Sequence, residues 1–316
     1  MRSVLAVTVA GVTAIGLASA VVARLYRTEP TTRAQQRIAV PAYWTPAVPA
    51  GRAMFDGLAA TAPATGIVVV NGSRSAPEVP RHPAWSQTVR TLRDGGTLPL
   101  GYVDTGYFGI DFGPGAHTTR PDGAGGGGSH LAAWRAQIDR DVDDWYALYG
   151  SDGLGGIFFD QTAALCGPDG AYVELHRAIV ERVRTRYPGA YVVMNPGRST
   201  ERCYAGIADT LVTFEGSYLE YLAHRPAPWE HRVPAARLWH LVYDAPDPAS
   251  MHRAVTLSKR RNAGFVYVTS EVLTPDGRRH PWDRLPDDGY WRAELTAAYG
   301  RPVVPPAVPV TAAGPR

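Results

Sequence analysis

Eight apolar stretches rich in β-branched or aromatic residues recur along this chain, and helical segments separate most of them. The stretches cover residues 37–44, 66–72, 98–107, 154–162, 190–197, 210–217, 238–245 and 264–272. Their apolar residues run continuously instead of alternating with polar ones, which is typical of parallel strands covered on both faces. A repeat of this kind indicates an α/β architecture built around a parallel sheet.

The segments between the stretches carry helical patterns. The clearest are residues 130–150 and 169–187, in which apolar residues lie three and four positions apart. Residues 247–264 begin with Asp-Pro and end in a basic turn before a glycine, as a helix does. Eight strand–helix units in about 265 residues predict a single-domain (β/α)8 TIM barrel. An open, doubly wound sheet is the alternative, but it seldom needs eight such regular units.

The predicted barrel domain, residues 37–300, lies between flanking segments of different character. Residues 4–23 carry no charge and are long enough to span a bilayer, whereas "ASA" ending at Ala20 suits a signal peptidase. We interpret residues 1–23 as a signal peptide or a signal anchor, and residues 24–36 as a linker. The barrel is therefore expected outside the cytoplasm, either secreted or anchored to the membrane. Residues 301–316, rich in Pro and Ala, predict a disordered tail.

Charge and cysteine content restrict the function further. The formal net charge is +3, and most of the excess comes from arginines in the first forty residues. No basic stripe with interleaved aromatic residues is present, so we expect no nucleic-acid partner. Two cysteines, Cys166 and Cys203, are too few for a metal site; they could pair in an oxidising compartment or remain free buried thiols. We expect no cofactor and no metal, and we expect a monomer.

The chemistry of a TIM barrel lies at the C-terminal ends of its strands. The corresponding ends of the eight stretches offer Tyr43 and Trp44; Asn71; Tyr102, Asp104 and Tyr107; Asp160 and Gln161; Asn195; Glu215; His240, Tyr243 and Asp244; and Tyr267, Ser270 and Glu271. Apolar sugar faces stack on Trp and Tyr rings, while carboxylates and amides bind hydroxyl groups. A single carboxylate of this kind is often a helix cap or a structural group, but the whole set favours a carbohydrate site.

Hydrolysis of a glycosidic bond requires two carboxyl groups that flank it. We favour Asp160 and Glu215, because they end the fourth and sixth stretches and can face each other across the barrel. Asp104 is a third candidate, or else a structural partner of a neighbouring tyrosine or backbone amide. Predicted substrate-binding residues are Tyr43, Trp44, Asn71, Tyr102, Asp104, Tyr107, Gln161, Asn195, His240 and Tyr243.

Five motifs make the chain similar to a known family. "VPAYWTP", "GYVDTGY", "GIFFDQ", "MNPG" and "ADTLVTFEGS" resemble, in order and spacing, the spherulin-4 family, glycoside hydrolase family 135. The resemblance covers roughly residues 38–300 and implies a (β/α)8 fold. It also implies endo-cleavage of α-1,4-linked N-acetylgalactosamine in an exopolysaccharide, so a polysaccharide substrate is expected. Related barrel families that cut partly de-N-acetylated amino-sugar polymers are the nearest alternatives.

The resemblance places the two family carboxylates on Asp160 and Glu215, but the chain departs from the family at the next position. The family pattern resembles "FDE", whereas this chain has Gln161, which cannot act as an acid. If the missing Glu were the proton donor, the protein would be impaired; if it shapes the pocket, Gln161 shifts substrate choice or pH optimum. We favour the second interpretation, with Glu215 as nucleophile and Asp160 as general acid/base.

Two further expectations follow from these positions. Cys166 and Cys203 follow neighbouring stretches, so we predict a disulfide that braces the site. A non-catalytic carbohydrate-binding barrel, in which Gln161 marks lost chemistry, is the alternative function. A structural surface protein without a sugar ligand has little reason to collect carboxylates at its strand ends.

Overall fold

The computed structural model describes residues 35–72, 77, 79–109, 131–276 and 278–300. Within this part, eight parallel strands pair in chain order and close into a barrel, because β1 pairs with both β2 and β8. The strands are β1 (Arg37–Ala42), β2 (Thr65–Val70), β3 (Leu98–Asp104), β4 (Gly156–Asp160), β5 (Tyr191–Asn195), β6 (Thr210–Ser217), β7 (Leu238–Tyr243) and β8 (Phe265–Val268). The predicted TIM barrel is confirmed.

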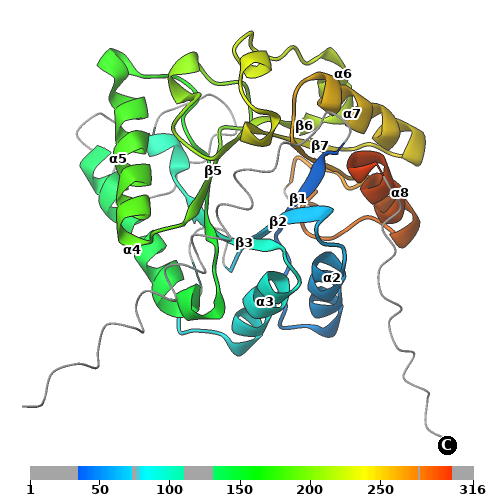
Figure 1. The fold of residues 1–316 in the computed structure, drawn as a ribbon, viewed down its shortest axis with the longest axis horizontal. Helices are drawn as coiled ribbons and strands as arrows, with labels where there is room; N and C mark the ends of the chain where they lie inside the picture. The colour runs from blue at the N-terminus through cyan, green and yellow to red at the C-terminus, as the bar shows by residue number, and fades with distance from the viewer. Residues whose placement is uncertain (1–34, 73–76, 78, 110–130, 277, 301–316) are drawn as a thin grey trace, which may run out of the picture.

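Helices surround the strands (Figure 1). They are α2 (Pro49–Ala60), α3 (Pro83–Asp94), α4 (Leu131–Tyr149), α5 (Ala171–Arg186), α6 (Tyr218–Ala223), α7 (Pro248–Arg260) and α8 (Asp288–Tyr299). Among the described residues, no helix combines the length and apolar character needed to cross a membrane. The predicted signal or anchor segment, most of the linker and the predicted tail lie outside the described residues, so those expectations stay predictions.

Local sequence signals set where the helices begin. Pro stands in the first turn of α2, α3 and α7, where its missing N–H removes no helical hydrogen bond. The Asp247 side chain caps α7 by accepting from the Ser250 N–H at 2.8 Å. Ser217 and Glu220 form a reciprocal capping box at the start of α6. Because α6 follows β6 directly, this cap turns the chain two residues after Glu215.

Aromatic side chains fill the barrel beneath the C-terminal strand ends. Phe158 of β4 packs against Tyr102 of β3, with ring centroids 6.1 Å apart, and against Trp239 of β7 at 5.6 Å. Residues two apart on a strand point to the same face, so the side chain of Asp160 follows that of Phe158 on the inner face. The apolar part of β4 is thus barrel core, and the strand ends in a carboxylate where that core stops.

Candidate active site

Two carboxylates and one amide meet at the C-terminal ends of β4, β5 and β6. Asp160 and Asn195 are register partners on neighbouring strands. The Asn195 Nδ2 atom donates to Asp160 Oδ1 and to Glu215 Oε2, each at 2.7 Å. Since both oxygens lie 2.7 Å from one nitrogen, they are separated by no more than twice that distance. The structure therefore brings together the predicted carboxylate pair and the predicted amide.

The remaining oxygens of the pair also accept hydrogen bonds. Tyr102 O–H donates to Asp160 Oδ2 at 2.9 Å, and the Tyr43 hydroxyl lies 3.5 Å from the same oxygen. On the other side of the pair, Trp282 Nε1–H donates to Glu215 Oε1 at 3.0 Å. Burial raises the pKa values of both tyrosines well above 10, so they stay protonated and act as donors.

Trp282 was not among the residues that the sequence predicted. It lies between β8 and α8, where the backbone N–H of Tyr43 donates to its carbonyl at 2.9 Å. Its ring packs against that of Tyr267, with centroids 5.6 Å apart, and is almost fully buried. One sequence feature could have identified it. Trp282 belongs to the Pro-containing segment 281–286, which follows the last strand and therefore lies at the C-terminal end of the barrel.

The electrostatics of the pair favour one shared proton. Burial, followed by the charge of Asp160, raises the pKa of Glu215 to about 7. Burial also raises the pKa of Asp160, but hydrogen bonds from Tyr102, the Gln161 backbone, Asn195 and Tyr43 oppose the rise. Two close carboxyl groups titrate as a unit, and the better-solvated anion is the one with more donors. Near neutral pH the proton therefore resides preferentially on Glu215.

The chain leaves β3 and β4 in a strained conformation beside the pair. Gln161 has a φ of 53° and Tyr107 a φ of 51°, in the left-handed region that side chains other than glycine rarely adopt. The Tyr107 N–H and the Thr105 hydroxyl both donate to the Gln161 carbonyl, at 2.7 and 2.9 Å. These bonds connect the two strand ends, and backbone strain of this kind clusters at functional sites.

Tyr107 and Asp104 occupy different positions around the pair. Burial and the charges of Asp160 and Glu215 raise the pKa of Tyr107 to about 12, which places its ring in their field. Asp104 pairs in register with Asp160, but its Oδ1 accepts from the backbone N–H of Gly106 at 2.7 Å. This contact corresponds to the structural alternative considered for Asp104.

Tyr243 and Asn71 lie at strand ends as the sequence predicts. The Tyr243 ring meets that of Trp282 edge to face, with centroids 6.2 Å apart. The charges of Glu220 and Glu215 add to burial in raising the pKa of Tyr243. Asn71 is buried directly after β2.

Trp44 and His240 do not face the carboxylate pair. Trp44 packs against Phe55 of α2, with ring centroids 5.2 Å apart, because it follows the inward-facing Tyr43. His240 is fully buried, and its Nδ1 lies 2.7 Å from the hydroxyl of Tyr221 in α6. The sequence predicted that both residues bind substrate. In the structure both side chains instead face the helix layer.

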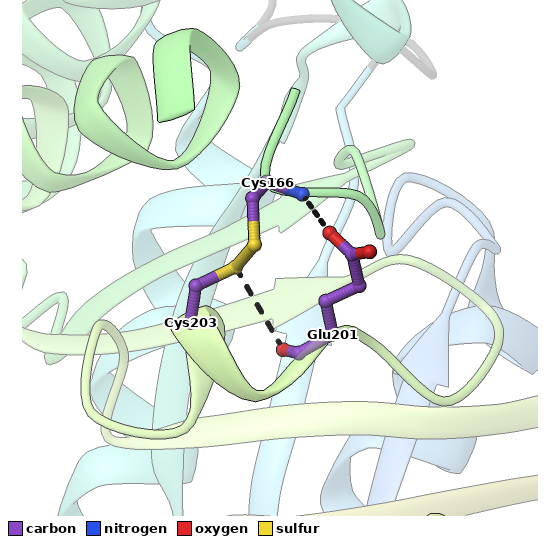
Figure 2. Close-up of side chains that lie close together, drawn as sticks. All are labelled: Cys166, Glu201 and Cys203. Atoms are coloured by element: carbon purple, nitrogen blue, oxygen red, sulfur yellow. Dashed lines mark hydrogen bonds between the residues drawn. A yellow bond between two sulfur atoms is a disulfide. The ribbon is translucent and has the colours of Figure 1, made fainter. Parts of the chain in front are cut away.

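A disulfide joins the loops that follow β4 and β5. Cys166 and Cys203 are bonded at an S–S distance of 2.09 Å across 37 residues of sequence (Figure 2). Glu201 lies beside them, and its Oε2 accepts from the Cys166 N–H at 2.6 Å. The Cys203 sulfur contacts the Glu201 carbonyl oxygen at 3.9 Å, but a disulfide sulfur has no hydrogen to donate. Because both sulfurs are bonded to each other, this group offers no thiolate for a metal.

The closed barrel, with two carboxylates paired at the C-terminal strand ends, defines a TIM barrel of the glycoside-hydrolase type. The sequence profile of Spherulin4, the spherulation-specific family 4, matches residues 37–298. This chain belongs to the Spherulin4 family. No curated protein sequence matches it.

Two solved structures illustrate the similarity in fold. The crystal structure of Aspergillus clavatus Sph3 in complex with GalNAc superposes with a TM-score of 0.61 at 21% identity, covering 83% of this chain and 98% of Sph3. A chitinase from Chromobacterium violaceum gives a TM-score of 0.50 at 15% identity, covering 82% of this chain and 98% of the chitinase. At these identities the comparison concerns the fold alone.

Proposed function

We propose that this protein is an endo-acting glycoside hydrolase that cleaves α-1,4-linked N-acetylgalactosamine or galactosamine exopolysaccharide. The observation that carries the proposal is the Asp160–Glu215 pair, held by one Asn195 nitrogen. The raised pKa of Glu215, which follows from burial and the charge of Asp160, agrees with it. Membership of the Spherulin4 family and the GalNAc complex of Sph3 support the choice of sugar. An exopolysaccharide substrate also agrees with the extracytoplasmic location that we propose from residues 1–23.

The electrostatics favour the opposite assignment of roles to the one made from sequence. Glu215, with its raised pKa, is suited to protonate the leaving glycosidic oxygen. Asp160, which accepts from Tyr102 and Asn195, is suited to remain ionised and attack the anomeric carbon. The short separation of the two carboxylates supports a retaining mechanism, for which the gap is about 5–5.5 Å.

In this scheme the reaction takes two displacements. Asp160 forms a glycosyl ester as the anomeric C–O bond breaks, and Glu215 gives its proton to the departing glycosidic oxygen, which leaves as a hydroxyl group. Glu215 then removes a proton from water, whose oxygen attacks the anomeric carbon and releases Asp160. Asn195 and Tyr102 orient Asp160 throughout, because each donates to a different carboxylate oxygen.

Gln161 is suited to bind the sugar in this scheme. Its side-chain Oε1 is buried without a hydrogen-bond partner among the described residues. A free amide of this kind can hold a hydroxyl or an N-acetyl group of the substrate. Gln161 directly follows Asp160 at the end of β4, and its backbone there lies in the left-handed region.

Cleavage assays on α-1,4-galactosaminan, both N-acetylated and partly deacetylated, test the proposal. New reducing ends and oligomer masses are followed for the wild type, Asp160→Asn, Glu215→Gln and Asp56→Asn, an exposed residue of α2 that serves as a matched control. We expect the first two variants to lose at least about 100-fold in rate, and the control to match the wild type. Binding of either polymer without cleavage by the wild type would instead identify a carbohydrate-binding barrel.

A further inference from the structure

Three side chains of metal-ligand type meet between the barrel and α6, away from the carboxylate pair. His224 follows α6, Glu230 begins the short helix η6 (Glu230–Arg232), and His240 lies in β7. Their potential ligand atoms all lie within 4.8 Å of one another. Glu230 and His240 are 0% exposed, whereas His224 is half-buried at the edge of the cluster. The register pairs His240 with Phe214, and both side chains face the helix layer.

The atoms that face one another in this cluster lack partners. Nε2 of His224, Nε2 of His240 and Oε2 of Glu230 are buried without a hydrogen bond to any described residue. The hydroxyl groups of Ser199 and Thr213 lie beside the Glu230 carboxylate, but no hydrogen bond of good geometry forms. A buried polar group without a partner costs about 1–3 kcal/mol, so a cluster of such atoms is a candidate site for an ion or a water molecule.

The second polar atoms of His240 and Glu230 are already engaged, which leaves their inward atoms free. His240 Nδ1 lies 2.7 Å from the Tyr221 hydroxyl, and Glu230 Oε1 accepts from the Ala227 N–H at 3.1 Å. A hydrogen bond at the second ring nitrogen is how proteins orient imidazoles that bind metals. The rings of His224 and His240 stand almost perpendicular, at 84°, with centroids 5.8 Å apart.

Charge in and around the cluster determines which ligand fits. Arg261, whose guanidinium lies 4.4 Å from the Tyr221 ring, opposes a cation here. Its N–H groups donate to the carbonyls of Tyr221 and His224, and Glu230 is the carboxylate of the cluster. Two imidazoles with one carboxylate form a donor set that Zn²⁺ prefers.

We propose that His224, Glu230 and His240 bind a structural Zn²⁺ ion that fastens the segment after α6 to β7. The fourth ligand is a hydroxyl or a water molecule held by Ser199 or Thr213. Thr213 lies where the register of β6 shifts, two residues before Glu215. The ion would thus stabilise the part of β6 that carries Glu215, and the inference stands whether or not the proposed hydrolase activity does.

Zinc binding by the untagged, non-reduced full chain tests the proposal. The protein is stripped with a chelator, incubated with ZnCl2, separated from free metal and analysed for zinc by mass spectrometry. We expect about one equivalent per chain and a rise in Tm of roughly 5 °C at a zinc concentration about 100 times Kd. X-ray absorption at the zinc edge should show two imidazole ligands.

Ligand variants and matched controls decide where zinc binds. Glu230→Gln and His224→Gln should weaken zinc binding by at least about 100-fold, while His252→Gln, an exposed histidine of α7, keeps it. Glu215→Gln should also keep it, which separates this cluster from the carboxylate pair. Circular dichroism without metal shows whether each variant is folded. If a variant does not fold, the X-ray absorption spectrum of the wild type still tests the ligands, because it needs no variant. A wild type without bound zinc, or zinc retained in both ligand variants, would overturn the proposal and leave water as the occupant.

Discussion

A single amide determines how the two candidate catalytic carboxylates behave. The Asn195 Oδ1 atom accepts from the Gly197 N–H at 2.9 Å, which leaves its Nδ2 to face Asp160 and Glu215. The NH2 group of one uncharged amide gives each carboxylate a single N–H and cannot neutralise both charges, so burial and mutual repulsion leave one proton on the pair. The donors around each carboxylate then decide where that proton resides.

Trp282 provides a test of that balance. Its hydrogen bond to Glu215 lowers the pKa of the carboxyl group, so Trp282→Phe should raise that pKa by up to about one unit. Glu215 acts as an acid only while protonated, and activity falls as pH rises through its pKa of about 7 in the wild type. The alkaline limb of kcat/KM against pH should therefore move upward in the variant.

Trp291→Phe is the matched control, because Trp291 also packs against Tyr267, with centroids 6.3 Å apart, but belongs to α8. Its alkaline limb should stay at the wild-type position. A limb that moves downward in Trp282→Phe, or does not move, would show that Glu215 is not the acid.

The strain at Gln161 predicts opposite changes in stability and activity. Glycine adopts a φ of 53° without steric cost, so Gln161→Gly should raise the free energy of unfolding by roughly 0.5–1 kcal/mol. Losing the amide should lower kcat/KM. Gln161→Ala is the control, since it also removes the amide but keeps the strain. Urea denaturation and initial rates measure the two effects, and equal stability of both variants would contradict the strain.

At the scale of the elements, the sequence predicted the strands better than the direction of their side chains. Continuous apolar runs identified all eight strands, and the strand ends identified Asp160, Asn195 and Glu215. The same continuity hides which residues face inward, because both faces of each strand are buried. Tyr43 and Trp44 are both aromatic and end the same apolar stretch, so the sequence does not show which of them faces inward. In the structure their side chains contact different layers.

Two other features of the site depend on structure that the sequence does not display. The register shift in β6 between Val212 and Phe214 sets which side chains of β6 and β7 share a face, and so places Phe214 beside His240 in the helix layer. Trp282 reaches Glu215 from a segment without regular structure after β8. Neither a bulge nor the path of a loop follows from hydrophobic periodicity, so the motifs could not show these contacts.

The disulfide is a covalent link between the elements that carry Asp160 and Asn195. It closes a loop across 37 residues, from the segment after β4 to that after β5. Chain-entropy arguments for a loop of this length give about 3–4 kcal/mol, so the double variant Cys166→Ser/Cys203→Ser should lose that much free energy of unfolding. Urea denaturation measures the loss, and the wild type in reductant should behave like the variant. A loss below about 1 kcal/mol would show that noncovalent contacts alone hold the two loops.

For the whole molecule, the seam between the first and last strands is the critical junction. β1 and β8 pair through two residues each, fewer than most neighbouring strands of the barrel. Helix α8 reinforces the seam, because Gln36 N–H donates to the Ala298 carbonyl at 3.1 Å. The Val268 N–H, at the end of β8, donates to Oε1 of the fully buried Glu294 at 2.6 Å. A single carboxyl group thus helps to hold the last strand to the last helix.

Burial of Glu294 should make the stability of the whole barrel depend on pH. Burial raises its pKa well above 4.5, so the folded protein keeps a proton that the unfolded chain releases once pH exceeds about 4.5. Because the folded state binds more protons, its stability falls as pH rises, until pH reaches the folded-state pKa. One such group contributes a slope of about 1.4 kcal/mol per pH unit.

Glu294→Gln keeps an acceptor for the Val268 N–H but cannot ionise, so its free energy of unfolding should lack this part of the slope. Between pH 5 and 7, roughly, the variant should gain on the wild type by up to about 1.4 kcal/mol per pH unit in urea denaturation. Glu174→Gln, at an exposed position of α5, should instead run parallel to the wild type. If the free energy of unfolding of Glu294→Gln changes with pH as that of the wild type does, Glu294 is ionised in the folded barrel. The seam would then contain a buried carboxylate instead of a protonated carboxyl group.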